Sequence, residues 1–341
     1  MPCVIASRDR WGAVAAVRVG HPLVDEYLEF ARSRARPNTV LAQAFDLKVF
    51  FETVDRTPVR VTSADVMAFI RSQQRSGSKV VRIDGSSGLS PRTIRRRLST
   101  VSTFYAYVLA RGQTSITRNP VPTGLVTRRE RSRPRQGVPL VRSPKMLPKV
   151  LSPAEVNALF AALRTDRDRA MVAAMVLGGL RRAEVLGLCF DDIRTADRRV
   201  FIADGKGGRQ RLIPVSDRFF KLVASYLETE RPADAVSDRV FVVLKGPNRG
   251  QPLSVRGLDQ IMRGARGRAG LSHGSCHELR HTCLTRLREA GMSLEALQAQ
   301  AGHASIETTR VYLHLADDWL AEQYRRAADA IDAQVVRAGV R

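Results

Sequence analysis

Histidines, an arginine and a tyrosine gather near the C-terminal end of this sequence. Residues 277–281 read His-Glu-Leu-Arg-His, residues 301–303 read Ala-Gly-His, and Tyr312 follows nine positions later. Guanidinium and imidazole groups can hold the free oxygens of a phosphodiester, and a phenol can attack its phosphorus as a nucleophile. These residue types therefore indicate cleavage of a phosphodiester by a tyrosine.

A second arginine and a lysine lie upstream of this group. Residues 178–184 read Gly-Gly-Leu-Arg-Arg-Ala-Glu, and residues 205–209 read Gly-Lys-Gly-Gly-Arg. Arg181 follows the Gly-Gly pair, where a new helix can begin and its first amides favour an anion. Arg280 comes three residues after His277, which predicts that both lie on one helical face. The two arginines can together clamp the oxygens on which negative charge grows during cleavage.

These short motifs form four boxes along the chain: residues 178–184, 205–209, 277–281, and 301–303 with Tyr312. In this order they resemble the motifs of the tyrosine recombinase (phage integrase) family, in its Xer- and integrase-like form, and the resemblance covers most of the chain. The chain departs from the family at Arg182, where a small or apolar residue is usual, and at Ala301, which replaces a frequent leucine. Neither departure touches the six positions to which the resemblance assigns catalysis, which are Arg181, Lys206, His277, Arg280, His303 and Tyr312.

The resemblance also implies a role for each of these side chains. Tyr312 is the expected nucleophile, which forms a 3′-phosphotyrosine link, and Lys206 is the general acid that protonates the departing 5′ oxygen. His303 is expected to hydrogen-bond the scissile phosphate. Because a phenol is a poor nucleophile at neutral pH, it needs a nearby base, and His277 is the expected base or proton shuttle.

Other polar residues in these boxes receive lesser roles. Glu184 is expected either to orient the neighbouring cations or to lie on the surface. No pairing argument singles out His281, which is assigned a structural role together with Tyr105, His273 and His314. No cofactor and no metal ion are expected.

Composition favours a nucleic-acid partner. The 341 residues include 56 basic and 33 acidic side chains, a net charge of +23, and such an excess favours binding to a polyanion through counterion release. Four scattered cysteines argue against a disulfide framework or a structural zinc site. The longest apolar run, residues 170–180, is too short to cross a bilayer, and the N-terminus lacks the apolar core of a signal peptide. We expect a cytoplasmic protein that binds double-stranded DNA and no membrane.

The pattern along the chain predicts two domains and a connector. Residues 1–20 form an N-terminal extension and residues 21–112 a helical DNA-binding domain. Residues 113–150 hold six prolines and nine basic residues, which indicate an extended linker that contacts phosphates or serves as a plain tether. Residues 151–336 form the catalytic domain. The predicted fold is mainly α with a small β-sheet: by the family resemblance, a SAM-like core-binding bundle followed by a mixed α/β catalytic domain.

Local signals predict where the elements begin and end. Capping residues predict helix starts at Thr62, at Ser90-Pro91 and at Ser152-Pro153. Glycines and serines predict a loop over residues 76–90. A buried helix is expected over residues 169–177. A β-hairpin is expected from two apolar strands, residues 200–202 and 211–215, on either side of a Gly-rich turn.

Two segments have both a structural and a functional interpretation. The helix after Ser90 carries basic residues at its start (Arg92, Arg95, Arg96 and Arg97), which predict either a DNA contact or a solvated face. Residues 319–336 form an amphipathic pattern. That segment packs either on its own domain or, by family resemblance, on a neighbouring subunit, which would link four protomers into a homotetramer on two DNA sites.

Two other functions were weighed against recombination. Residues 277–281 also match the H-E-x-x-H signature of zinc proteases, with His277 and His281 as ligands, Glu278 as base and Glu295 or His303 as third ligand. A DNA-binding accessory factor without catalysis is the second alternative, although a pure binder does not need Tyr312. The favoured hypothesis is a site-specific DNA recombinase. It is either the integrase or transposase of a mobile element or a Xer-like resolvase of chromosome dimers.

Overall fold

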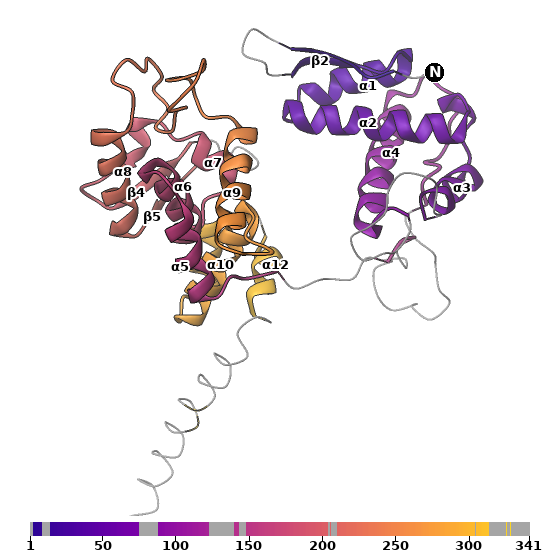
Figure 1. The fold of residues 1–341 in the computed structure, drawn as a ribbon. Helices are drawn as coiled ribbons and strands as arrows, with labels where there is room; N and C mark the ends of the chain where they lie inside the picture. The colour runs from indigo at the N-terminus through magenta and orange to yellow at the C-terminus, as the bar shows by residue number, and fades with distance from the viewer. Residues whose placement is uncertain are drawn as a thin grey trace, which may run out of the picture. The chain divides into compact units, whose positions relative to one another are not determined.

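The computed structural model divides the chain into two compact units, Met1–Lys145 and Met146–Arg341 (Figure 1). Within them it describes residues 3–8, 14–74, 88–122, 140–142, 148–203, 205, 210–303, 305–313, 325 and 328. The described part is mainly helical and contains two small antiparallel sheets, which confirms the predicted fold class. No helix in this part is both long and apolar enough to traverse a lipid bilayer.

The first unit combines a hairpin with a small helical bundle. Its elements are β1 (Ile5–Arg8), β2 (Val14–Arg18), α1 (Pro22–Arg32), α2 (Pro37–Val54), the 3-10 turn η1 (Pro58–Arg60), α3 (Ser63–Gln74) and α4 (Pro91–Arg111). Ser90 caps α4 by accepting a hydrogen bond from the Thr93 amide at 3.2 Å. Thr62 and Asp65 bond reciprocally at the start of α3. Both predicted helix starts are confirmed.

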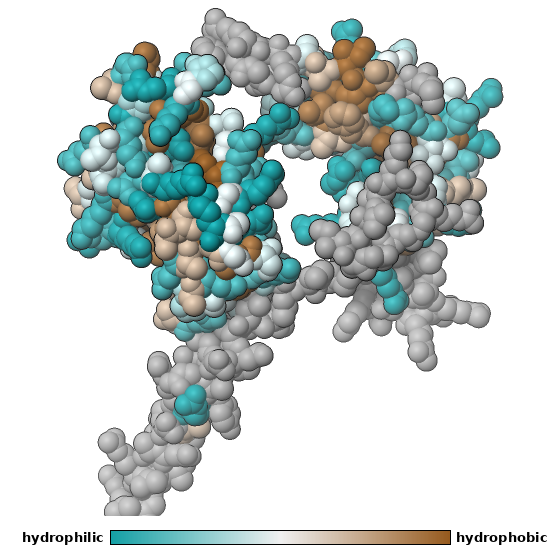
Figure 2. Space-filling model, in the orientation of Figure 1, coloured by the Kyte–Doolittle hydropathy of each residue, from teal (hydrophilic) through white to brown (hydrophobic). Residues whose placement is uncertain are grey.

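Aromatic side chains fill the core of this unit. Phe50 packs edge-on against Phe69, and Phe104 packs edge-on against Tyr27 and Tyr105, which are the arrangements that ring quadrupoles favour. Val121 and Val141, from the expected linker range, are buried in the same core. Figure 2 shows an apolar patch over the region of α1 on an otherwise largely hydrophilic face.

A buried carboxylate gives the basic end of α4 a structural function. Asp46 of α2 is 2% exposed and accepts hydrogen bonds from Arg96 at 2.5 Å and from Thr100 at 3.1 Å. Arg97 lies 3.8 Å from the same carboxylate. Two of the four basic residues thus hold helices together, although the Arg96 side chain is still 52% exposed. Arg92 and Arg95 are exposed to solvent and lie outside this pairing with Asp46, so the expected DNA contact stays a prediction mainly for these two.

The second unit surrounds one buried helix. Its elements are α5 (Pro153–Ala162), α6 (Asp166–Val176), α7 (Arg182–Leu186), the turn η2 (Phe190–Asp192), β3 (Ile193–Arg194), β4 (Arg199–Ile202), β5 (Arg211–Pro214), α8 (Asp217–Thr229), α9 (Val255–Arg268), α10 (Cys276–Glu289), α11 (Leu294–Ala301), α12 (Ile306–Thr309) and the turn η3 (Arg310–Leu313). Helix α6 packs against α8 and α10, and residues 170–175 of α6 are fully buried. The predicted capping box at Ser152 and the predicted buried helix are confirmed.

The sheet of this unit has three antiparallel strands in the order β3-β4-β5. Strands β4 and β5 form the predicted hairpin, in which Val200 pairs with Ile213, and β3 adds a third strand that the sequence pattern does not predict. Both paired residues are buried. The inward side of β5 therefore faces the core of the unit.

Glycines and caps set the loops on which the catalytic candidates lie. Gly179 has φ +71, and a Cβ atom on Gly178 would lie 2.9 Å from the Ala174 carbonyl oxygen, so this turn after α6 requires glycine. Ser275 and Glu278 form a reciprocal capping box at the start of α10. Gly302 ends α11 with φ +59. These turns bring residues 179–184, 277–281 and 301–303 to the same region of the unit.

Several predictions concern residues outside the described ranges. These residues are most of the loop at residues 76–90, the linker arginines Arg128 to Arg135, Lys206 and most of the amphipathic segment 319–336. Within that segment only Arg325 and Ala328 are described, and both are helical. The predictions for these segments therefore stay predictions.

Candidate active site

Four of the six predicted catalytic side chains form one cluster in the second unit. The Arg280 Nη2 atom lies 3.2 Å from His303 Nε2, and the rings of His303 and Tyr312 stack with centroids 6.5 Å apart. Arg181 joins them by donating a hydrogen bond to the Gly302 carbonyl oxygen at 3.3 Å. His277 is connected to Tyr312 through His281, and Lys206 is outside the described residues.

Arg280 is held rigidly inside this cluster. Its side chain is 3% exposed and donates hydrogen bonds to the carbonyl oxygens of Gly179 and Ala301, each at 2.5 Å. Burial, followed by the charge of Arg181, lowers the pKa of Arg280 to about 10. The guanidinium is therefore still charged at neutral pH, in an orientation set by two loops.

Glu184 neutralises this concentration of positive charge. It accepts hydrogen bonds from Arg181 Nη1 at 2.7 Å and from Arg211 at 3.0 and 2.9 Å, and its Oε2 atom lies 3.9 Å from Arg280. Burial alone would raise the pKa of Glu184, but the hydrogen bonds from Arg211 and Arg181 outweigh it and lower the pKa to about 2. The carboxylate is 5% exposed, so of the two expected roles the structure supports orientation of cations.

Arg181 occupies the predicted position at the start of a helix. It is the N-cap of α7, and its own amide donates to Glu184 at 2.8 Å. This backbone group is therefore engaged in capping, so the Arg181 guanidinium is the group left to bind an anion. Its side chain is 23% exposed, whereas that of Arg280 is almost fully buried.

Arg211 was not anticipated from the sequence. It lies two residues before buried Ile213 on β5 and so shares the inward face of the strand, where it binds Glu184 and donates through Nε to the Gln300 carbonyl oxygen at 3.3 Å. A Cβ atom on Gly302 would lie 2.9 Å from Arg211 Nη1. The period-two pattern of the strand was the available signal, because it put a charged residue at an inward position.

His303 connects Arg280 to the segment that carries Tyr312. Its Nδ1 atom lies 3.0 Å from the hydroxyl of Thr309, at the end of α12, and its Nε2 atom faces Arg280. Burial, followed by the charge of Arg280, lowers the pKa of His303 to about 4. The ring is therefore neutral at neutral pH, and because Arg280 can only donate to Nε2, the ring proton lies on Nδ1.

Tyr312 lies in the turn η3 and is 1% exposed. Burial raises its pKa to about 12, although Arg280 acts in the opposite direction. Its hydroxyl lies 2.7 Å from His281 Nδ1, and His281 Nε2 lies 2.9 Å from His277 Nε2. The contact with His281 was not anticipated; the i, i+4 spacing of the two histidines on one helix was the available signal.

Side chains of the alternative zinc site have other partners. The Glu278 carboxylate accepts hydrogen bonds from the amides of Gly274 and Ser275 at 2.8 and 2.7 Å, so it caps α10 instead of facing the two histidines. His303 is engaged by Thr309 and Arg280. Within the described residues, no group of three or more His, Cys, Asp or Glu side chains is arranged to hold a metal ion.

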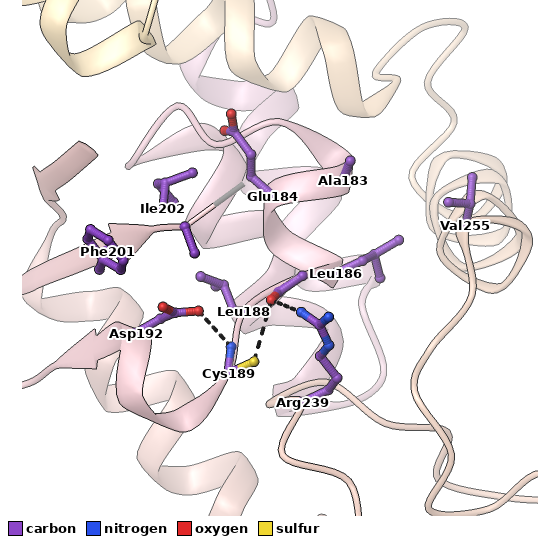
Figure 3. A pocket seen from close by; sticks show the side chains of 12 residues that line it. Ala183, Glu184, Leu186, Leu188, Cys189, Asp192, Phe201, Ile202, Arg239 and Val255 are labelled. Carbon is purple, nitrogen blue, oxygen red and sulfur yellow. Dashed lines mark hydrogen bonds between the residues drawn. The ribbon is translucent and has the colours of Figure 1, made fainter. Parts of the chain in front are cut away.

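A pocket behind α7 is separate from this cluster. It is lined by residues of α7, η2 and β4 together with Arg239 and Val255, and Figure 3 shows the Glu184 carboxylate directed away from the other polar groups in it. Asp192 accepts from the Cys189 amide at 2.9 Å, and Arg239 donates to the Gly187 carbonyl oxygen. These polar groups hold the loop after α7 in place, and we assign the pocket no chemistry.

Glu184 generates a prediction about pH. Because its pKa is lowered from 4.5 to about 2, the ionised carboxylate stabilises the fold above about pH 4.5, and this contribution disappears as the pH falls toward 2. Glu184→Gln should therefore lower the urea midpoint of this unit at pH 7, and the difference from the wild type should shrink between pH 5 and pH 2. Glu29→Gln, an exposed control in the first unit, should track the wild type. Parallel curves for the wild type and Glu184→Gln would contradict the prediction.

Comparison with known proteins identifies the family. Residues 149–318 match the model of the phage integrase family, and residues 24–112 match that of the phage integrase N-terminal SAM-like domain. Tyrosine recombinase XerD of Caulobacter vibrioides is 32% identical over 315 residues, which cover 89% of this chain and 94% of that protein.

Two solved structures share the fold. XerH site-specific recombinase, bound to its palindromic difH substrate, has a TM-score of 0.65 at 19% identity and covers 88% of this chain and 83% of its own. The Tn1549 transposon integrase, in complex with transposon right end DNA, has a TM-score of 0.65 at 18% identity and covers 90% and 98%. The resemblance read from the four boxes is confirmed, and the chain belongs to the phage integrase family of tyrosine-type, site-specific DNA recombinases.

Proposed function

We propose that Tyr312 is the nucleophile of this recombinase and that it attacks a phosphodiester of double-stranded DNA to form a 3′-phosphotyrosine link. The observation that carries this proposal is the cluster itself: the Tyr312 ring stacks on His303, which contacts Arg280, and Arg181 lies against Gly302. A phenol surrounded by two guanidinium groups is suited to attack an anion, because the cations stabilise both the phosphate and the developing phenolate.

Arg181 and Arg280 bind the two free oxygens of the scissile phosphate. Glu184 and three backbone carbonyls hold these guanidinium groups before any substrate arrives. Preorganised donors of this kind stabilise transition-state charge without a reorganisation cost. The more exposed Arg181 side chain makes the first contact with the phosphate, and the buried Arg280 side chain binds it from the protein interior.

His303 donates a hydrogen bond to the scissile phosphate. Arg280 Nη2 can only donate, so in the structure His303 Nε2 accepts from it and the ring proton lies on Nδ1, 3.0 Å from the Thr309 hydroxyl. The Nε2 atom is on the side where the phosphate oxygens bind, and His303 donates to the phosphate once this nitrogen is protonated.

Lys206 protonates the departing 5′ oxygen, and His277 takes part in removing the proton of Tyr312. The role of Lys206 rests on the family resemblance and on its position in the connection between β4 and β5. Once formed, the phosphotyrosine keeps the energy of the broken phosphodiester, so a 5′ hydroxyl from a partner duplex can rejoin the strand without ATP. Reversal of the same step completes strand exchange.

We also propose where the reaction takes place and which process it serves. The net charge of +23 favours binding to DNA, and we propose that the reaction takes place in the cytoplasm. The recombinase is either the integrase or transposase of a mobile element or a resolvase of chromosome dimers. Flanking repeats or phage genes beside the coding sequence would support the mobile element, and their absence would favour the alternative.

A Tyr312→Phe variant tests the nucleophile. It should lose covalent attachment to DNA completely and keep its affinity for the site, because only the attacking oxygen is removed. The site is first recovered from a library of nicked duplexes with randomised arms, by selecting those that become attached to the wild-type protein. Covalent complexes are then counted on denaturing gels. A variant that still becomes attached would show that another residue is the nucleophile.

The two arginines should affect cleavage much more than binding. Arg181→Ala and Arg280→Lys are expected to slow single-turnover cleavage by about 100- to 1,000-fold, because they act on charge that develops in the transition state. Arg182→Ala is the matched control, since Arg182 is the next residue and its side chain is 43% exposed and paired with Asp259. Equal losses in binding and cleavage for Arg181→Ala would contradict the assignment.

A homotetramer on two DNA sites is expected to depend on the segment after Asp318. A chain ending at Asp318 should bind single sites normally in gel-shift assays and fail to form synaptic complexes on DNA with paired sites. Circular dichroism and thermal unfolding of the shortened chain report whether it is folded. Normal synapsis would refute docking of this segment on a neighbouring subunit, and an unfolded product would indicate packing on its own domain.

A further inference from the structure

The base that contacts Tyr312 in the structure is His281. The Tyr312 hydroxyl lies 2.7 Å from His281 Nδ1, and the two rings lie 5.7 Å apart between centroids. His277, which the sequence marks as the expected base or shuttle, contacts His281 instead. Because a general base must lie within hydrogen-bond distance of the proton that it removes, His281 is in the position to act first.

The two histidines form a path from the buried phenol to solvent. His281 Nε2 lies 2.9 Å from His277 Nε2, and the ring centroids are 4.3 Å apart. One turn of α10 separates them, so the helix itself sets their spacing. Tyr312 is 1% exposed, His281 is half-buried and His277 is exposed. A proton that leaves Tyr312 can therefore reach water through these two rings.

His281 is uncharged at neutral pH, as a proton acceptor must be. Burial, followed by the neighbouring His277 and Arg280, lowers the pKa of His281 to about 4, so its ring is neutral at neutral pH. The titratable and charged groups that face the path come from α10, from the loop after α11 and from the residue before α7: His277, Glu278, Arg280, Cys283, His303 and Arg181. The cations among them also stabilise the phenolate once it forms.

We propose that His281 is the direct proton acceptor for Tyr312 and that His277 relays the proton to solvent. As the bond from the Tyr312 oxygen to phosphorus forms and the bond to the 5′ oxygen breaks, the phenolic proton moves to His281 Nδ1. The proton on His281 Nε2 moves to His277 Nε2, and His277 releases its Nδ1 proton to water. The 5′ oxygen takes its proton from the general acid. Rejoining reverses each transfer.

This relay rests on the proposed role of Tyr312 and changes the order of the bases. It accounts for two features that phosphate binding by Arg181 and Arg280 does not explain. One is a second histidine at the i+4 position, and the other is the Tyr312 hydroxyl, which is directed at the ring of that histidine. Arg280 lies between the two histidines in sequence but points to Gly179 and Ala301, so the relay and the clamp lie on different faces of α10.

Single-turnover cleavage of the nicked duplex by the full chain, followed from pH 6 to 9, tests the relay. In His281→Asn, an amide occupies the place of Nδ1, so it can hydrogen-bond the phenol but cannot take its proton. We expect cleavage to fall by about 100- to 10,000-fold. The remaining rate should rise about tenfold per pH unit as hydroxide replaces the base, more steeply than in the wild type. Added imidazole should restore cleavage in His281→Ala.

Controls separate the relay from a structural effect. His273→Asn is the matched histidine variant, because His273 lies outside the cluster and pairs with Glu155 at 3.3 Å; it should cleave like the wild type. His277→Asn should lose less activity than His281→Asn, since water can accept the proton from His281. Binding of the nicked duplex, measured by gel shift, should be unchanged in all these variants.

Each other outcome overturns the relay. A wild-type rate in His281→Asn, or a slower rate with the wild-type pH profile and no rescue by imidazole, would make His281 a structural residue. A steeper pH profile in His277→Asn alone would make His277 the direct base. These results are distinct from failure of the nucleophile assignment, which would appear as covalent attachment in Tyr312→Phe. Selective ¹⁵N spectra of the DNA-free chain give a second test, in which His281 should carry its proton on Nε2.

Discussion

The active site depends on one buried carboxylate. Glu184 binds Arg181 and Arg211 directly and lies 3.9 Å from Arg280. Three guanidinium groups placed this close in a protein interior would repel one another and draw in water. One fully ionised carboxylate offsets part of that repulsion and leaves a net positive charge. A surplus of positive charge is what the proposed binding of a phosphodiester requires, so the same interaction that stabilises the fold would also prepare the site.

Neighbouring residues of helix α10 make different kinds of contact. Glu278 caps the helix, Arg280 turns into the core toward two loop carbonyls, and His277 and His281 share a third direction, toward solvent and toward Tyr312. The rotation of about 100° per residue produces this division without any further element. His277 and Arg280, although three residues apart, consequently face different surroundings, and the simple expectation of a shared face is wrong for them.

In the first unit, one helix carries arginines that bind a carboxylate of the bundle and arginines that do not. Asp46 engages Arg96 and Arg97 within the bundle, and this pairing leaves Arg92 and Arg95 exposed. A buried carboxylate paired with arginine therefore recurs in both units. In the first unit it joins two helices, whereas in the second it orients the guanidinium groups of the candidate active site.

The sequence alone determined the family and the helix starts, and it predicted most of the residues that gather in the candidate site. These features depend on residues close together in the chain, such as the Ser275–Glu278 capping box and the Gly178-Gly179 turn before Arg181. Only the tertiary structure decided that Arg211 binds Glu184, 27 positions away, and that His281 contacts Tyr312, 31 positions away. Local patterns single out Arg211 and His281 but not their partners, because each contact forms only when β5, α7, α10 and η3 pack around the buried helix α6.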